Sequence, residues 1–187
     1  MQLHGSGRIN SQGHLEIGGV DTCSLVDKYG SPLFVYDEGL IRDQCRRFHK
    51  ALSKSGLDYH ISYASKAFIC KELVRIMKEE DMGLDVVSVG ELYNAISVDF
   101  DSQKIHLHGN NKTEYEIGYA LENNIGCFVI DSLAEIERLN RIGGQMGKRA
   151  KALLRVTLGV EAHTHEFITT GNTDSKFGLN IDNGQAR

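Results

Sequence analysis

The chain has 187 residues, 41% of them hydrophobic, and its 25 aspartate and glutamate residues outnumber 21 lysine and arginine residues, giving a formal net charge of −4. This length suits one ordinary domain or part of a larger one. The positive charges are spread along the chain, so we expect no basic face for nucleic acid. No stretch approaches the roughly 18 apolar residues of a membrane span, and the N-terminus has no apolar signal-peptide core. We therefore expect a cytoplasmic protein that binds neither nucleic acid nor a membrane.

The cysteine and histidine patterns do not predict a metal site. Four cysteines lie far apart in the sequence, at Cys23, Cys45, Cys70 and Cys127. Without a CxxC pair, we expect them to be reduced thiols of a cytosolic protein. His106 with His108, and His163 with His165, each place two imidazoles on one side of an extended segment. We expect no metal at either pair, because neither has cysteines or paired carboxylates nearby at ligand spacing.

The first thirty residues differ from the rest of the chain. A turn signal at Gln12-Gly13 between two short alternating runs predicts a small hairpin, and the run from Val20 to Tyr29 predicts a short helix. We therefore assign residues 1–30 to a β-rich second domain and residues 31–187 to a separate β/α domain.

From residue 33 onward, short apolar runs alternate with amphipathic ones, the pattern of strands followed by helices. In chain order, the strands are predicted at Leu33–Tyr36, Tyr59–Ser65, Leu84–Val87, Ile105–His108, Cys127–Ile130 and Ala152–Leu158, separated by helices at Glu38–Leu52, Phe68–Glu80, Gly90–Val98, Thr113–Asn123 and Ser132–Ile142. Units of about 20 to 25 residues imply parallel strands joined by right-handed crossovers. The fold class is therefore α/β, either an open doubly wound sheet or a (β/α) barrel.

Local signals agree with these helix boundaries. Thr113 with Glu116, and Ser132 with Glu135, have the spacing of a capping box at a helix start. Three glycines fall at or just past predicted helix ends, where a left-handed residue is common: Gly83, Gly126 and Gly143.

One lysine stands where barrel enzymes keep their chemistry. In the strand that ends at Ser65, alternation puts Ser62, Ala64 and Lys66 on one face, with Lys66 just past the carboxyl end. The same reasoning puts His106 and His108 on one face of their strand. A lysine at this position can bind phosphate, pair with a buried acid, or form an imine. A solvated lysine on a loop is the simpler alternative.

Several strings along the chain resemble one family. They are YASKAF at 63–68, GLDVVSVGEL at 83–92, IHLHGNNK at 105–112, HTHEFITTG at 163–171 and DSKFGL at 174–179. Together they are similar to diaminopimelate decarboxylases, which belong to the alanine-racemase-like, fold type III pyridoxal-phosphate enzymes. The HTHEFITTG segment favours this branch over the ornithine decarboxylases. The resemblance implies a (β/α)8 barrel of the TIM type.

The resemblance also implies roles for individual residues. Lys66 matches the lysine that condenses with the aldehyde of pyridoxal 5'-phosphate. Asp85 and Arg155 match residues near the cofactor, although a plain structural ion pair is the alternative for each. The segment from His163 to Gly171 matches a mobile loop that closes over the substrate, with Ile168 a candidate contact to its side chain.

The activity implied is the decarboxylation of meso-2,6-diaminopimelate to L-lysine and CO2 by a homodimer. Two alternatives stay open: a related decarboxylase of ornithine, arginine or a carboxylated polyamine, and a non-catalytic relative that binds a partner decarboxylase. About five of eight barrel strands are predicted, and the family's glycine-rich phosphate turn and C-terminal β domain are not found. We therefore expect the N-terminal part of a longer enzyme, inactive and prone to aggregation as 187 residues alone.

Overall fold

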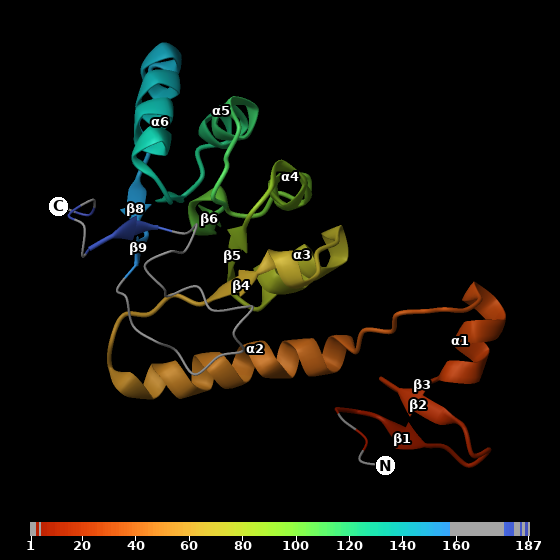
Figure 1. Cartoon of the computed structure of the whole chain (residues 1–187). Coiled ribbons are helices and arrows are strands. Elements are labelled where there is room, and N and C mark those ends of the chain that lie inside the picture. Colours follow the sequence, from red (N-terminus) through yellow and green to blue (C-terminus); the bar gives the residue numbers. More distant parts are fainter. Residues whose placement is uncertain (1–2, 4, 158–177, 182–183, 185, 187) are drawn as a thin grey trace. The chain divides into compact units, whose positions relative to one another are not determined.

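The structure is a computed structural model that describes residues 3, 5–157, 178–181, 184 and 186 (Figure 1). The chain divides into two compact units, Met1–Ile61 and Ser62–Arg187. No helix of the described residues is long and apolar enough to cross a membrane.

The first unit begins with the predicted hairpin, extended to three antiparallel strands. These are β1 (Arg8–Ile9), β2 (Leu15–Ile17) and β3 (Val20–Asp21), in the order β1-β2-β3. The Asn10 side chain closes the turn, because its Oδ1 accepts from the backbone N–H groups of Gln12 and His14, both at 3.0 Å. Helix α1 (Thr22–Tyr29) starts two residues later than predicted, because Val20 and Asp21 pair with β2.

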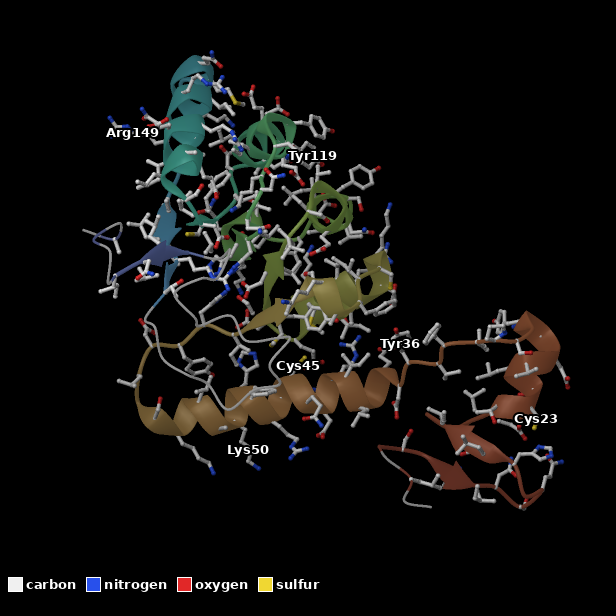
Figure 2. The ribbon with its side chains drawn as sticks, in the orientation of Figure 1. Cys23, Tyr36, Cys45, Lys50, Tyr119 and Arg149 are labelled. Atoms are coloured by element: carbon white, nitrogen blue, oxygen red, sulfur yellow. The ribbon has the colours of Figure 1, made fainter. Side chains whose placement is uncertain are left out.

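Helix α2 (Glu38–Leu52) has the predicted bounds and is capped by Asp37, whose side chain accepts from the Leu40 N–H at 3.1 Å. A single 3₁₀ turn (Ser53–Ser55) follows it. Figure 2 shows Cys45 on α2 and Cys23 on α1, and both are free thiols.

The strand predicted at Leu33–Tyr36 is wrong. This segment, which ends at the labelled Tyr36 just before α2 in Figure 2, belongs to no sheet of the described residues. Phe34 is 87% exposed. An apolar run becomes a strand only where a neighbouring strand satisfies its backbone groups, and the run itself does not specify such a neighbour.

The second unit is built on five parallel strands in chain order, each followed by a helix or short connection. The strands are β4 (Ser62–Ala64), β5 (Gly83–Val86), β6 (Ile105–Leu107), β7 (Cys127–Ile130) and β8 (Ala152–Leu154), and the connecting helices are α3 (Lys71–Glu79), α4 (Val89–Ile96), α5 (Glu114–Glu122) and α6 (Leu133–Met146). Short 3₁₀ turns, Ser65–Ala67 and Ser102–Lys104, follow β4 and precede β6.

Figure 1 shows α3 to α6 fanning out along one side of these strands. Helices on one side only are the arrangement of a (β/α) barrel, whereas a doubly wound sheet has helices on both faces. The core lies between the strands and these helices. Its completely buried side chains include Leu84, Leu92, Ile105, Leu107, Ile117 and Phe128. Of the two fold alternatives, the structure thus supports an incomplete barrel, with five of its eight strands in the described residues.

The capping signals predict the starts of α5 and α6, but the predicted glycine caps do not end their helices, and α3 begins three residues later than predicted, at Lys71. Thr113 and Glu116 form the complete capping box. The left-handed residues after α3 and α5 are Asp81 and Asn124, so the glycine caps predicted there are wrong. Helix α6 runs past the third predicted glycine to Met146 and is capped by Gly147, which has φ of 64°.

Gly126 has a different reason to be glycine. A Cβ there would lie 2.0 Å from the backbone oxygen of Gln103, because the turn before β6 passes directly against the start of β7.

The last predicted strand is split at Arg155. Residues before it pair with β7, and β9 (Val156–Thr157) pairs in parallel with β10 (Leu179–Asn180). The Arg155 N–H donates to the Ile130 oxygen at 2.9 Å, whereas its carbonyl accepts from the Leu179 N–H at 2.8 Å. Arg155 is therefore the residue at which the chain changes its pairing partner.

Candidate functional site

A cleft of about 940 Å³ opens at the carboxyl ends of the five parallel strands. Each strand or the residues directly after it contribute to the lining, which consists of Ala64, Lys66, Asp85, Val87, His106, His108, Gly109, Asn110, Val129, Leu153, Leu154 and Arg155. A second hollow of about 580 Å³ lies beside α6 and is mostly apolar. The first cleft is the candidate site, because it collects cations, a carboxylate and imidazoles in one concave space.

Lys66 lies in the 3₁₀ turn that directly follows β4 and lines this cleft. Its neighbour Ser65 is only 1% exposed and does not line the cleft. The Tyr63 hydroxyl donates to the Phe68 carbonyl at 2.8 Å, which ties together the two ends of the turn that carries the lysine. The amine therefore stands at the mouth of the sheet, on the face that side-chain alternation predicts.

Asp85 lies beside two histidines of the next strand. Parallel pairing sets Asp85 opposite Ala64 on one side and opposite His106 on the other. Its Oδ1 is 3.3 Å from the His106 Nδ1 and 3.7 Å from the His108 Nε2. Burial is the largest single influence on Asp85 and raises its pKa, but the polar contact and charge of His108, with the charge of His106, lower the pKa overall. The carboxylate is thus held in its charged form inside the cleft.

Arg155 reaches the cleft from the point where β8 ends. Its Nη1 lies 3.5 Å from the Oδ1 of Asp131, a residue that is 4% exposed and follows β7 directly. The same oxygen accepts from the Gly178 N–H at 3.1 Å. Asp131 was missed by the sequence reasoning, which treated it only as part of a helix start. Its position directly after a buried apolar strand was the available signal.

A further group of possible metal ligands lies in the first unit. His14, Asp21 and Cys23 offer ligand atoms within 4.8 Å of one another. Local hydrogen bonding explains this arrangement, because Asp21 caps α1 through the Cys23 N–H at 2.7 Å and lies 2.8 Å from the His14 Nδ1. The His14 hydrogen bond is the largest cause that lowers the pKa of Asp21 to about 2.

The fold and the cleft together define a (β/α)-barrel protein with a lysine at the strand ends. Residues 38–187 match a family model described as the pyridoxal-binding domain of pyridoxal-dependent decarboxylases. The chain therefore belongs to the pyridoxal-dependent decarboxylase family.

Individual relatives show which members of this family the chain resembles. The chain is 54% identical to a diaminopimelate decarboxylase of Staphylococcus aureus over 96% of its length, and 50% identical to that of Bacillus subtilis over 99%. A crystal structure of diaminopimelate decarboxylase from M. jannaschii superposes with a TM-score of 0.87 at 34% identity, over 97% of this chain. The same protein has been solved in complex with L-lysine, with equal similarity.

The chain spans 42% of the length of both curated relatives and of the M. jannaschii structure. The family match begins at residue 38, whereas the compact units divide at Ile61 and Ser62, so the predicted domain boundary after residue 30 stays a prediction. Ile168, the candidate substrate contact, and the pair His163 and His165 lie outside the described residues.

The groups in the cleft fit pyridoxal phosphate. Lys66 offers an amine for an aldehyde, and Arg155 offers a cation for an anionic group. Asp85 Oδ1 is buried and has no hydrogen bond of good geometry within the described residues, so it can accept one from a ligand.

Proposed function

We propose that this chain carries the cofactor lysine of a pyridoxal-phosphate-dependent decarboxylase that converts meso-2,6-diaminopimelate to L-lysine and CO2. The observation that carries the proposal is the position of Lys66 in the cleft, among Asp85, the two histidines and Arg155. The names of the relatives at 50 to 54% identity support this substrate, and the M. jannaschii complex shows that a protein of this fold binds L-lysine.

Pyridoxal phosphate, when bound, supplies the electron sink that makes loss of an α-carboxylate feasible. Lys66 would hold it covalently through Nζ, and Arg155, oriented by Asp131, would bind an anionic group. Asp85, stabilised by His106 and His108, would keep a negative charge inside the cleft that holds the cofactor. These two histidines and Lys66 are the cleft groups able to hold or deliver the proton that replaces the departing carboxylate.

A cytoplasmic location and a homodimeric assembly belong to the same proposal. All four cysteines are free thiols, which suits a reducing compartment. Sedimentation of the complete polypeptide tests the assembly, with a dimer as the expected mass and a monomer as the contradicting one.

The test of function is CO2 release by the polypeptide of the complete reading frame that carries this sequence. With pyridoxal phosphate added, meso-diaminopimelate should be decarboxylated in preference to L-ornithine, L-arginine and a carboxylated polyamine. Lys66→Ala should lower kcat by about 10² to 10⁴-fold, because it removes an amine that both attaches the cofactor and transfers protons.

Lys104→Ala is the matched control. Lys104 lies in the 3₁₀ turn before β6 and forms an exposed ion pair with Asp81, which follows α3. Lys104 does not line the cleft, so removing its side chain should leave kcat unchanged. A preference for ornithine, arginine or the polyamine would contradict the assigned substrate. Absence of CO2 release from every substrate by a folded protein would contradict the enzyme itself and favour the non-catalytic relative.

A further inference from the structure

A charged pair is buried directly behind the cleft. The Nζ of Lys112 lies 2.6 Å from the Oε1 of Glu135, and their side chains are 2% and 4% exposed. Lys112 comes from the loop between β6 and α5, and Glu135 from the first turn of α6. Neither residue lines the cleft.

Every donor of the Lys112 ammonium has an acceptor. Besides Glu135, Nζ donates to the Gly109 oxygen at 2.8 Å and to the Val129 oxygen at 2.6 Å. An ammonium has three N–H donors, so this lysine is fully satisfied. Gly109 lies in the loop after β6 and Val129 in the neighbouring strand β7, and both line the cleft. The lysine therefore ties the loop after β6 to the end of β7.

Glu135 extends the same connection. Its Oε2 accepts from the Asp131 N–H at 3.2 Å, which fixes the backbone of the residue whose carboxylate contacts Arg155. Glu135 thus gives up the capping-box role that its spacing from Ser132 predicts, because both of its oxygens face this network. Arg138 adds a hydrogen bond from the next turn of α6 to the Lys112 carbonyl at 2.5 Å.

Stability alone explains this pair poorly. The desolvation free energy of two buried charges is about as large as the free energy of their attraction. An apolar pair of similar volume would therefore stabilise the packing of the helices on the sheet equally well. What an apolar pair would not provide is three directed hydrogen bonds to backbone groups that shape the rim of the cleft.

We propose that Lys112 and Glu135 are positioning residues, which hold Gly109, Asn110 and Asp131 in the geometry that binds pyridoxal phosphate. Gly109 has φ of 113°, and a Cβ on it would lie 3.3 Å from the Val87 oxygen, so this loop runs close against β5 and has little room to shift. The inference rests on the proposed function, because the ligand it concerns is the proposed cofactor.

The test compares the parent with Lys112→Met and with the double variant Lys112→Met/Glu135→Gln. The single variant leaves a buried carboxylate unpaired and should be strongly destabilised. The double variant removes both charges but keeps an acceptor for the Asp131 N–H, so much of the stability should return. Its Kd for pyridoxal phosphate should still be about 10- to 100-fold weaker, by analogy with the loss caused by removing residues that support metal ligands.

Lys148→Met is the matched control. Lys148 is also a lysine with several acceptors, the Leu121 and Glu122 oxygens and the Asn124 Oδ1, but these lie at the end of α5, outside the cleft. This variant should lose stability and keep the parent's Kd. A second readout is amide hydrogen exchange of the peptide 108–112 in the absence of cofactor, which should speed up in the double variant and stay unchanged in the control.

A double variant with the parent's Kd and the parent's exchange rate in 108–112 would overturn the proposal and leave the pair a structural one. A parent that binds no pyridoxal phosphate would contradict the proposed function instead. In that case the exchange rates still decide whether the pair holds the loop.

Discussion

Asp85 illustrates how the sheet determines the charge of one side chain. Parallel pairing places it next to His106, and His108 follows two residues later on the same strand face. Burial alone would raise the pKa of this carboxyl, but the two imidazoles lower the pKa of Asp85 below its ordinary value. A negative charge can therefore persist inside the partly enclosed cleft that Lys66 also lines.

The first prediction concerns acid stability. A carboxyl whose pKa is lower in the folded than in the unfolded chain stabilises the fold above its ordinary pKa of about 4, and this contribution is lost as the pH falls through the folded pKa. Asp85→Asn should therefore lower the urea midpoint at pH 7 and flatten its decline below about pH 4. Asp43→Asn, on the exposed side of α2, should reproduce the parent's profile. Superimposable profiles for Asp85→Asn and the parent would contradict the stabilising role of the histidines.

Among single residues, the sequence placed Lys66 well and Asp131 poorly. Side-chain alternation and a strand end are local properties, so they predict where Lys66 stands. The contacts of Asp131 with Arg155 and Gly178 join positions 24 and 47 residues apart, and no local pattern encodes them. The contacts of Lys112 with Val129 and Glu135 could not be predicted either, because they also join positions far apart in the sequence.

At the scale of elements, helices α5 and α6 begin with the same motif and use it differently. Thr113 accepts from the Glu116 N–H at 3.2 Å, and Glu116 returns a bond by accepting from the Thr113 N–H at 2.9 Å. In α6, Ser132 caps the Glu135 N–H at 3.3 Å, but the glutamate side chain turns to Lys112. The motif predicts where a helix starts, whereas the glutamate's partner depends on the neighbouring loop.

The second prediction is that Thr113→Ala lowers the free energy of unfolding by about 0.5 to 2 kcal/mol, because the α5 start loses its side-chain acceptor. Thr113→Ser retains the hydroxyl and should stay near the parent. Urea denaturation of the three proteins measures the difference. Equal losses for alanine and serine would show that the methyl group, rather than the cap, is responsible.

Elements were predicted well where both periodicity and capping signals were present. They were predicted poorly where the structure of a segment depends on which other segment it contacts. Helix α2 was placed to the residue. Four of the five parallel strands fall within the predicted runs, and β5 begins one residue before its predicted run, at Gly83. The Leu33–Tyr36 run has the composition of a strand but pairs with no neighbouring strand of the described residues. The predicted glycine caps failed because aspartate and asparagine also tolerate a left-handed backbone, so Asp81 and Asn124 ended their helices first.

On the scale of the whole molecule, alternating strands and helices were enough to predict parallel β/α units, but two architectures fitted that pattern equally. The two architectures differ in which faces of the sheet the helices cover. Because right-handed crossovers all run in the same direction around a closing sheet, a barrel has its helices on one side only, as α3 to α6 do (Figure 1). The barrel places the carboxyl ends of strands that lie far apart in sequence around one cleft. Lys66, Asp85 and Arg155 meet there for that reason, and their shared site is the basis of the proposed chemistry.

The most direct measurement is covalent trapping of the cofactor. The polypeptide of the complete reading frame is incubated with pyridoxal phosphate, reduced with borohydride and digested. Its peptides are then mapped by mass spectrometry. The account predicts one dominant pyridoxyl adduct, on Lys66, and its loss in Lys66→Ala, whereas Lys104 and Lys148 stay unmodified. A folded chain that carries its adduct on another lysine, or none at all, would contradict the assignment of the cleft.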